Sequence, residues 1–234
     1  MKIEFLYPEV ASLFGELGDI DFLIKSYPKA QIFKTKLIER PRFLNETIDF
    51  VFIGPMTERV QERVITSLMP DKDIVREKIE SGLTMLAISN AVEIFGQYIE
   101  TDDDKKIEAL GIFPFYARRQ MLDRLSDVFI GKRGELDIIG LKAQFTQVYK
   151  TDDLPYLCEV EKGFGLNLQS REEGICSNNF LGTYLLGPFL VSNPLFAKTW
   201  LEEQFPEETI ELPFFDLAVS AYWKHLEDIR LMRP

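Results

Sequence analysis

Residues 83–96 read LTMLAISNAVEIFG, an apolar run typical of a short buried strand, followed from Ser89 by a helix-like pattern. The small residues Ala87 and Ala91 lie two positions before and two positions after Ser89. The stretch predicts a sharp turn from strand to helix, which lifts one side chain above the carboxyl end of a sheet, beside free helix N–H groups. This is the arrangement of a nucleophile elbow, with Ser89 at its tip.

The chain before this turn alternates between strand-like and helix-like patterns. Strands are predicted at residues 2–7, 29–33 and 50–54, and helices at residues 18–26, from Thr57 onwards, and from Asp71 or Asp73 to near Gly82. We expect Thr57 to cap the first turn of its helix. The alternation predicts an α/β fold: a flavodoxin-like three-layer sandwich with a mostly parallel, doubly wound sheet and helices on both faces.

After Gly96 the pattern changes to short strands and then to helices. Residues 100–106 form a charged run, which we expect to be a solvated loop because its aspartates lack the spacing of a cation site. Strand-like segments are residues 127–131, 136–141, 145–149 and 180–185; helical patterns follow Asn193, as the expected cap, and span about 214–231. Because repeats and an obvious linker are absent from the sequence, we expect one domain over residues 1–234.

The composition excludes several classes of function. The chain has 27 Lys+Arg against 38 Asp+Glu, a formal charge of -11, and no basic stripe, which argues against a nucleic-acid partner. Cys158 and Cys176 form neither a metal-binding spacing nor a disulfide framework. The sequence shows neither a signal peptide nor an apolar run of the roughly 18 residues of a membrane helix, so we expect a cytoplasmic protein. We expect no metal and no cofactor. The single histidine, His225, limits acid–base chemistry near neutral pH.

Four short motifs, in the same order along the chain, resemble those of class I glutamine amidotransferases. They are LYPE, LFG and GDI within residues 6–20, FIGPMTER at 52–59, the elbow at 85–96, and GTYLLGP at 182–188 with Asn193-Pro194 behind it. The most similar branch is the cobyric-acid-synthase-like one, which includes the small glutaminase that works with a Mur-ligase-like partner to amidate a peptidoglycan precursor. The resemblance covers roughly residues 2–205 and implies the family's fold.

The resemblance also implies where a catalytic pair would stand. In this family a cysteine thiolate attacks the side-chain amide of glutamine, and a histidine serves as base and then as acid. The nucleophile position falls on Ser89 and the base position on Leu186. The plain structural alternative for Ser89 is a cap on the helix that it begins. We expect His225 on the exposed side of the C-terminal helix, away from this pair.

The parts of the family's site that bind substrate and stabilise the oxyanion are changed as well. One backbone donor would come from the turn Gly54-Pro55-Met56, where Pro55 has no N–H and a shift of one residue would move the role to Met56. The second donor would be the N–H of Asn90, which replaces a residue that is usually glycine. Glu93 stands where the branch often has glutamine.

The segment expected to recognise glutamine gives little support for binding. Residues 140–146 correspond best to the family's polar strand turn, and they keep little of its polar character, which argues against glutamine binding. Arg118, Arg119 and Arg133 could hold a carboxylate, but we expect surface positions for all three.

These changes favour a catalytically inactive homologue, because losing triad members leaves only residual catalysis. We expect such a homologue to bind or regulate a ligase or synthetase, or to form a homodimer. The aromatic segments 113–116 and 212–215 are the first candidates for the partner surface. The alternative is an active amidotransferase or hydrolase that uses Ser89 with a non-histidine base, such as Glu93 or a carboxylate of residues 171–173.

Overall fold

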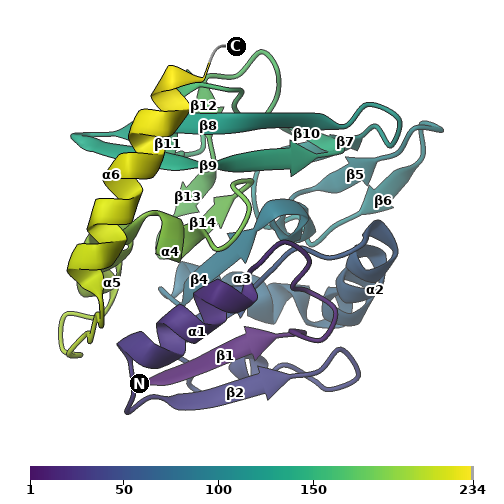
Figure 1. Cartoon of the computed structure of the whole chain (residues 1–234). Helices are drawn as coiled ribbons and strands as arrows, with labels where there is room; N and C mark the ends of the chain where they lie inside the picture. The colour runs from purple at the N-terminus through teal and green to yellow at the C-terminus, as the bar shows by residue number, and fades with distance from the viewer. Residues whose placement is uncertain (233–234) are drawn as a thin grey trace.

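The computed structural model describes residues 1–232, and its central element is a six-stranded sheet (Figure 1). The strand order is β13-β14-β4-β3-β1-β2. The strands are β1 (Lys2–Leu6), β2 (Gln31–Thr35), β3 (Phe50–Ile53), β4 (Thr84–Ile88), β13 (Ile175–Ser177) and β14 (Phe180–Thr183). All neighbours pair in parallel except β13, which is antiparallel to β14. The predicted α/β sandwich with a mostly parallel sheet is confirmed.

Helices cover both faces of this sheet. One face packs against α1 (Leu17–Ser26), the short α4 (Phe189–Ser192) and α5 (Pro194–Gln204), and the other against α2 (Glu58–Leu68) and α3 (Lys72–Glu80). Strand β3 shows why both faces are needed: Phe50 and Phe52 join one hydrophobic cluster, and Val51 and Ile53 join the opposite one. Alternate residues of a strand point to opposite faces, so a continuous apolar run must be covered on both sides.

The second half of the chain adds two four-stranded sheets. One contains β5 (Tyr98–Glu100), β6 (Lys106–Glu108), β7 (Phe115–Arg119) and β10 (Thr146–Lys150), and the other β8 (Leu125–Arg133), β9 (Leu136–Gln144), β11 (Cys158–Lys162) and β12 (Glu172–Glu173). Helix α6 (Phe215–Leu231) lies against β8, through Tyr222, Leu226 and Ile229 (Figure 1). Single 3₁₀ turns are η1 (Arg42–Leu44) and η2 (Met69–Asp71). No helix within residues 1–232 is both long and apolar enough to span a membrane.

Most sequence-based element predictions are confirmed, with small shifts. Thr57 caps α2 by accepting a hydrogen bond from the Val60 N–H at 3.4 Å. The charged run forms the turn between β5 and β6. The strand expected at residues 29–33 is two residues later, as β2. The aromatic segment 113–116 is not a surface, because Phe113 and Phe115 are buried in the core, whereas Phe214 of the segment 212–215 is 80% exposed.

Asn193 has a different role from the predicted helix cap. Its side chain makes no capping bond to α5. Instead, Asn193 Oδ1 accepts from the Ile139 N–H at 2.8 Å, and Nδ2 donates to the carbonyls of Ile139 and Phe189, both at 2.9 Å. The buried amide therefore joins β9 to α4 and holds the segment that follows β14 against the sheet formed by β8, β9, β11 and β12.

This bridge predicts a specific loss of stability. Asn193→Ser introduces a hydroxyl that can cap a helix but removes the amide, so we expect it to lower the free energy of unfolding by about 2–4 kcal/mol, since buried backbone groups lose their partners. Urea unfolding measures this, with Asn45→Ser at an exposed position as the control. Equal stability of Asn193→Ser and the unchanged protein would contradict a stabilising role for this bridge.

Candidate functional site

The predicted turn forms at Ser89. Strand β4 ends at Ile88, and Ser89 opens the 3₁₀ helix η3 (Ser89–Phe95), which takes the place of the expected α-helix. Ser89 has φ +56°, in the left-handed region that favours glycine, as a strained elbow requires. The alternative reading as a helix cap is wrong, because Ile88 occupies the N-cap position and no side chain caps η3.

A cavity of about 150 Å³ lies at this turn. Its lining residues come from the loop before α1, the start of α2, η3, the loop before β8, the β9–β10 connection and the segment after β14. They are Leu13, Phe14, Met56, Thr57, Glu58, Ser89, Asn90, Glu93, Arg124, Ala143, Gln144, Phe145, Thr146 and Tyr184. Ser89 itself is 5% exposed, and its hydroxyl has no hydrogen-bond partner among residues 1–232. The structure therefore provides a pocket over the serine but no base in contact with it.

Leu186 lies at the same edge of the sheet as Ser89. Strands β14 and β4 run in parallel with Thr183 opposite Ile88, so the residues that follow the two strands approach each other. Leu186 is 8% exposed, and its N–H donates to the Leu141 carbonyl at 2.9 Å. A leucine side chain cannot accept a proton, so this position offers no base. His225 is exposed on α6, as predicted.

Asn90 closes the turn that would supply the first oxyanion donor. Its Oδ1 accepts from the Met56 N–H at 3.1 Å, and its Nδ2 donates to the Met56 carbonyl at 2.7 Å. Pro55 has no N–H, and Gly54 is packed so closely that a Cβ would lie 2.4 Å from the Ala11 carbonyl oxygen. The turn therefore directs no free donor into the cavity. The N–H of Asn90 itself lies in the first turn of η3, where helix geometry leaves donors without an intrahelical partner.

Glu93 is a buried carboxyl group that lines the cavity. It is 1% exposed; its Oε2 accepts from Gln61 Nε2 at 2.8 Å, and its Oε1 accepts from the Tyr184 hydroxyl at 3.0 Å. Arg119 continues the chain by donating to Gln61 Oε1 at 2.8 Å. Burial raises the pKa of Glu93 to about 7, although the bonds from Gln61 and Tyr184 and the nearby charge of Arg119 oppose the rise. The expected surface position of Arg119 is wrong, since it is 6% exposed.

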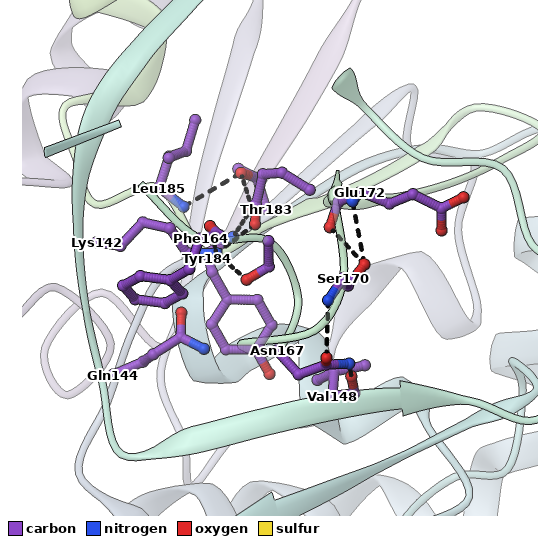
Figure 2. A network of polar contacts seen from close by, with 12 residues as sticks. Lys142, Gln144, Val148, Phe164, Asn167, Ser170, Glu172, Thr183, Tyr184 and Leu185 are labelled. Atoms are coloured by element: carbon purple, nitrogen blue, oxygen red, sulfur yellow. Dashed lines mark hydrogen bonds and ion pairs between the residues drawn. The ribbon is translucent and has the colours of Figure 1, made fainter. Parts of the chain in front are cut away.

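The carboxylates at residues 171–173 are engaged elsewhere. Glu172 pairs with Lys150 at 2.6 Å, and Glu173 pairs with Lys142 at 2.5 Å in a fully buried ion pair. Figure 2 shows Lys142 beside Phe164 and Tyr184. Glu173 also accepts from the Tyr184 N–H at 2.8 Å, so it positions the segment that leads to Leu186. Neither carboxylate lines the cavity at Ser89.

Sequence reasoning missed several residues of the cavity. Residues 140–146 are more polar than expected: Gln144 and Thr146 are buried and line the cavity, and buried Lys142 pairs with Glu173 outside it. Lys142 and Gln144 lie two positions apart on β9 and so share one face of that strand, whereas Thr146 begins β10. Arg124 lies in a loop at the mouth of the cavity, and its sequence surroundings carried no signal of this role.

The raised pKa of Glu93 predicts a pH-dependent stability. An acid whose pKa in the folded state lies above its ordinary value of 4.5 stabilises the fold fully below about pH 4.5, and this contribution is lost as the pH rises through about 7. The difference corresponds to on the order of 3 kcal/mol. We expect Glu93→Gln to remove this loss, so that its stability relative to the unchanged protein increases between pH 5 and pH 8.

Urea unfolding at these two pH values measures the effect. Burial also raises the pKa of Asp19 to about 7, and comparison of Glu93→Gln with the unchanged protein separates the contribution of Glu93 from that of Asp19. Glu80→Gln, at an exposed position on α3, is the matched control and should change nothing. Equal pH dependence in Glu93→Gln and the unchanged protein would contradict the prediction.

Comparison with known proteins agrees with this arrangement of motifs. Residues 2–194 match the model of the CobB/CobQ-like glutamine amidotransferase domain. The lipid II isoglutaminyl synthase (glutamine-hydrolyzing) subunit GatD of Staphylococcus aureus is 31% identical over 189 residues, which are 78% of this chain and 75% of that protein. The GatD subunit of Streptococcus pneumoniae is 24% identical over 230 residues, 94% and 87% of the two chains.

A solved glutamine amidotransferase structure has the same fold, with a TM-score of 0.58 at 11% identity over 86% of this chain and 98% of that one. The family match spans most of the chain and includes the elbow at Ser89, the turn at Gly54 and the segment after β14. The chain therefore belongs to the CobB/CobQ-like glutamine amidotransferase family.

Proposed function

We propose that this chain is a non-hydrolysing member of its family that acts as a binding or regulatory subunit of a ligase or synthetase. The observation that carries the proposal is the Ser89 hydroxyl, which lies in the cavity without a hydrogen-bonded base among residues 1–232. Leu186, which by resemblance corresponds to the family's histidine, follows the neighbouring strand and supplies no base. A serine hydroxyl is hardly ionised at neutral pH, so it depends on an adjacent base more than a thiol does.

The backbone around Ser89 adds to this argument. Stabilising the oxyanion requires donors aimed at the cavity, and removing one such donor costs about 10²–10³ in rate. Here Pro55 lacks an N–H, and the N–H of Met56 donates to Asn90 instead. Loss of the thiol, the base and one donor would leave essentially no hydrolysis by the family's mechanism.

The names of the relatives support a role as a subunit. Both are described as the GatD subunit of a synthase, and this chain spans most of each of them. A subunit that has lost its own reaction can keep the surface with which it contacts a partner. A single domain over residues 1–234 and a cytoplasmic location remain predictions.

A second candidate function is a hydrolase or acyl-transfer enzyme in which Ser89 is the nucleophile and Glu93 is the base. Glu93 favours it in one respect, because it lines the same cavity and has a pKa of about 7. Its two oxygens already accept hydrogen bonds from Gln61 and Tyr184, which weakens it as a base for Ser89.

The absence of hydrolysis is directly testable. We expect the purified chain to release no ammonia from L-glutamine above the blank, and Ser89→Ala to give the same result, because the hydroxyl has no base. A coupled ammonia assay measures this, with an active glutaminase of the family as the positive control. Ammonia release that disappears in Ser89→Ala would refute the proposal. Covalent labelling of Ser89 by a serine-directed probe, if the labelling is lost when Glu93 is replaced, would support the second candidate function.

The subunit role predicts a defined complex. We expect the tagged chain, cross-linked in its native cells, to retain one ligase- or synthetase-type protein in near-equimolar amount, and the two purified proteins to form a complex in size-exclusion chromatography with light scattering. Phe214→Ser, which removes an 80% exposed ring, should weaken this complex if segment 212–215 forms the contact. A stable homodimer that retains no such protein would contradict the prediction.

A further inference from the structure

A second cavity, of about 240 Å³, lies near the start of β14, whereas Ser89 lies beside the end of that strand. It is bounded by α5, by the turn between β13 and β14, and by Arg133 at the end of β8. Phe180 begins β14 and lines this cavity, and Tyr184 follows β14 and lines the one at Ser89. Among the residues that the structure describes, none lines both cavities, so this is a separate site.

Helix α5 presents one row of side chains to this second cavity. Phe196, Trp200, Glu203 and Gln204 all line it, and they follow one another at the three- and four-residue spacing of one helix face. The rings of Phe196 and Trp200 are stacked, with centroids 6.1 Å apart and an interplanar angle of 10°. From Phe196 to Glu203 the helix rises about 10 Å. The cavity therefore follows α5 from an aromatic floor to a polar end.

The two ends of this cavity carry opposite charges. Arg133 lies over the Phe196 ring, 5.8 Å from its centroid, where it donates to the Leu157 carbonyl at 2.9 Å and faces the Cys176 thiol. Glu203 lies about two helical turns further along α5. These are the two charged side chains among the described lining residues, and neither forms an ion pair within residues 1–232. A zwitterion with well-separated charges would pair both of them.

Side-chain amides form the wall between the charged ends. Nδ2 of Asn178 and Nδ2 of Asn179 donate to backbone carbonyls within residues 79–82, at 3.5 and 2.8 Å, so each Oδ1 is left to accept a bond. Gln204 Oε1 accepts from the Thr84 hydroxyl at 3.5 Å, which leaves its Nε2 as a donor. A peptide unit brings one N–H and one C=O, so it finds an acceptor and a donor on this wall.

These features distinguish a short peptide from other small charged molecules. A free α-amino acid carries both charges on one carbon atom, too close together to reach the two ends of the cavity. Two or three residues of an extended chain span about 7–10 Å, which matches the rise of α5 along the cavity. A simple anion would leave Glu203 without a partner, and a diamine would leave Arg133 without one.

We propose that this second cavity binds a free dipeptide or tripeptide. The carboxylate of the peptide lies at Arg133, its ammonium group lies at Glu203, and its peptide units lie against Asn178, Asn179 and Gln204. The site is separate from Ser89, so binding involves no reaction there. Because the peptide joins α5 to the turn before β14, it stabilises the folded chain increasingly as its concentration rises.

Isothermal titration calorimetry of the full chain at pH 7.5 tests the inference with Ala-Ala, Ala-Phe and Ala-Ala-Ala. The comparison ligands are L-alanine, whose charges are close together, and the N-acetyl and C-terminal amide forms of each peptide, which lack one charge. We expect the best peptide to bind at least about tenfold more tightly than L-alanine and than its own blocked forms. Equal binding of a blocked form, or no binding of any peptide, would overturn the inference.

Two variants determine the orientation of the peptide. Arg133→Gln should weaken binding of the free peptide by at least about tenfold and leave the affinity for its C-terminal amide unchanged. Glu203→Gln should have the same effect on the free peptide and leave the affinity for the N-acetyl form unchanged. Both side chains are exposed, so both variants should fold.

The matched controls are the preceding residues in the chain. Lys132→Gln removes a cation that pairs with Asp137 outside the cavity, and Glu202→Gln removes an exposed carboxylate on α5 that does not line it. Both should bind the peptide normally. A loss in either control equal to that in its neighbour would contradict the proposed positions of the two charges.

The ammonia assay is independent of these titrations. Failure of the peptides to bind leaves the absence of hydrolysis standing, and ammonia release would refute the proposed function whatever the titrations gave.

Discussion

The parallel pairing of β14 with β4 is the constraint on which the site depends. Because Thr183 lies opposite Ile88, both strands end at one edge of the sheet, so Ser89 and the segment before Pro188 must meet there. Two buried carboxylates hold that segment: Glu173 accepts the Tyr184 N–H at 2.8 Å, and Glu16 accepts the Gly187 N–H at 3.0 Å. The backbone of the site is therefore maintained by bonds that need neither a nucleophile nor a base.

The same backbone carries a set of side-chain hydrogen bonds around and behind the elbow. Asn90 joins η3 to the turn after β3 through two hydrogen bonds to Met56, and one of them uses the N–H that could have faced an oxyanion. Glu93, Gln61 and Arg119 form a buried polar chain behind the elbow.

The fold was more accessible from the sequence than the site was. The run of Phe50–Ile53 and the turn at Ser89 are local patterns, and local periodicity together with the handedness of crossovers determines a parallel sheet. The use of Asn193 as a bridge to β9 and the clasp of Asn90 on Met56 depend on residues 34 or more positions away in the chain. Single-sequence patterns contain no information about such pairings. The two-residue spacing of Lys142 and Gln144 was visible, but its meaning required the pairing of β9 and the position of Glu173.

Two features of the cavity argue that it is more than a remnant. Ser89 keeps a left-handed backbone that costs about 1–3 kcal/mol for a residue other than glycine. Gln144 buries a carbonyl oxygen without a donor, at a cost of about 1–3 kcal/mol. A chain that needed only the fold would be more stable with glycine at position 89 and an apolar residue at position 144. Both costs fall in one cavity, so the residues at positions 89 and 144 are not those that packing and backbone conformation alone would favour.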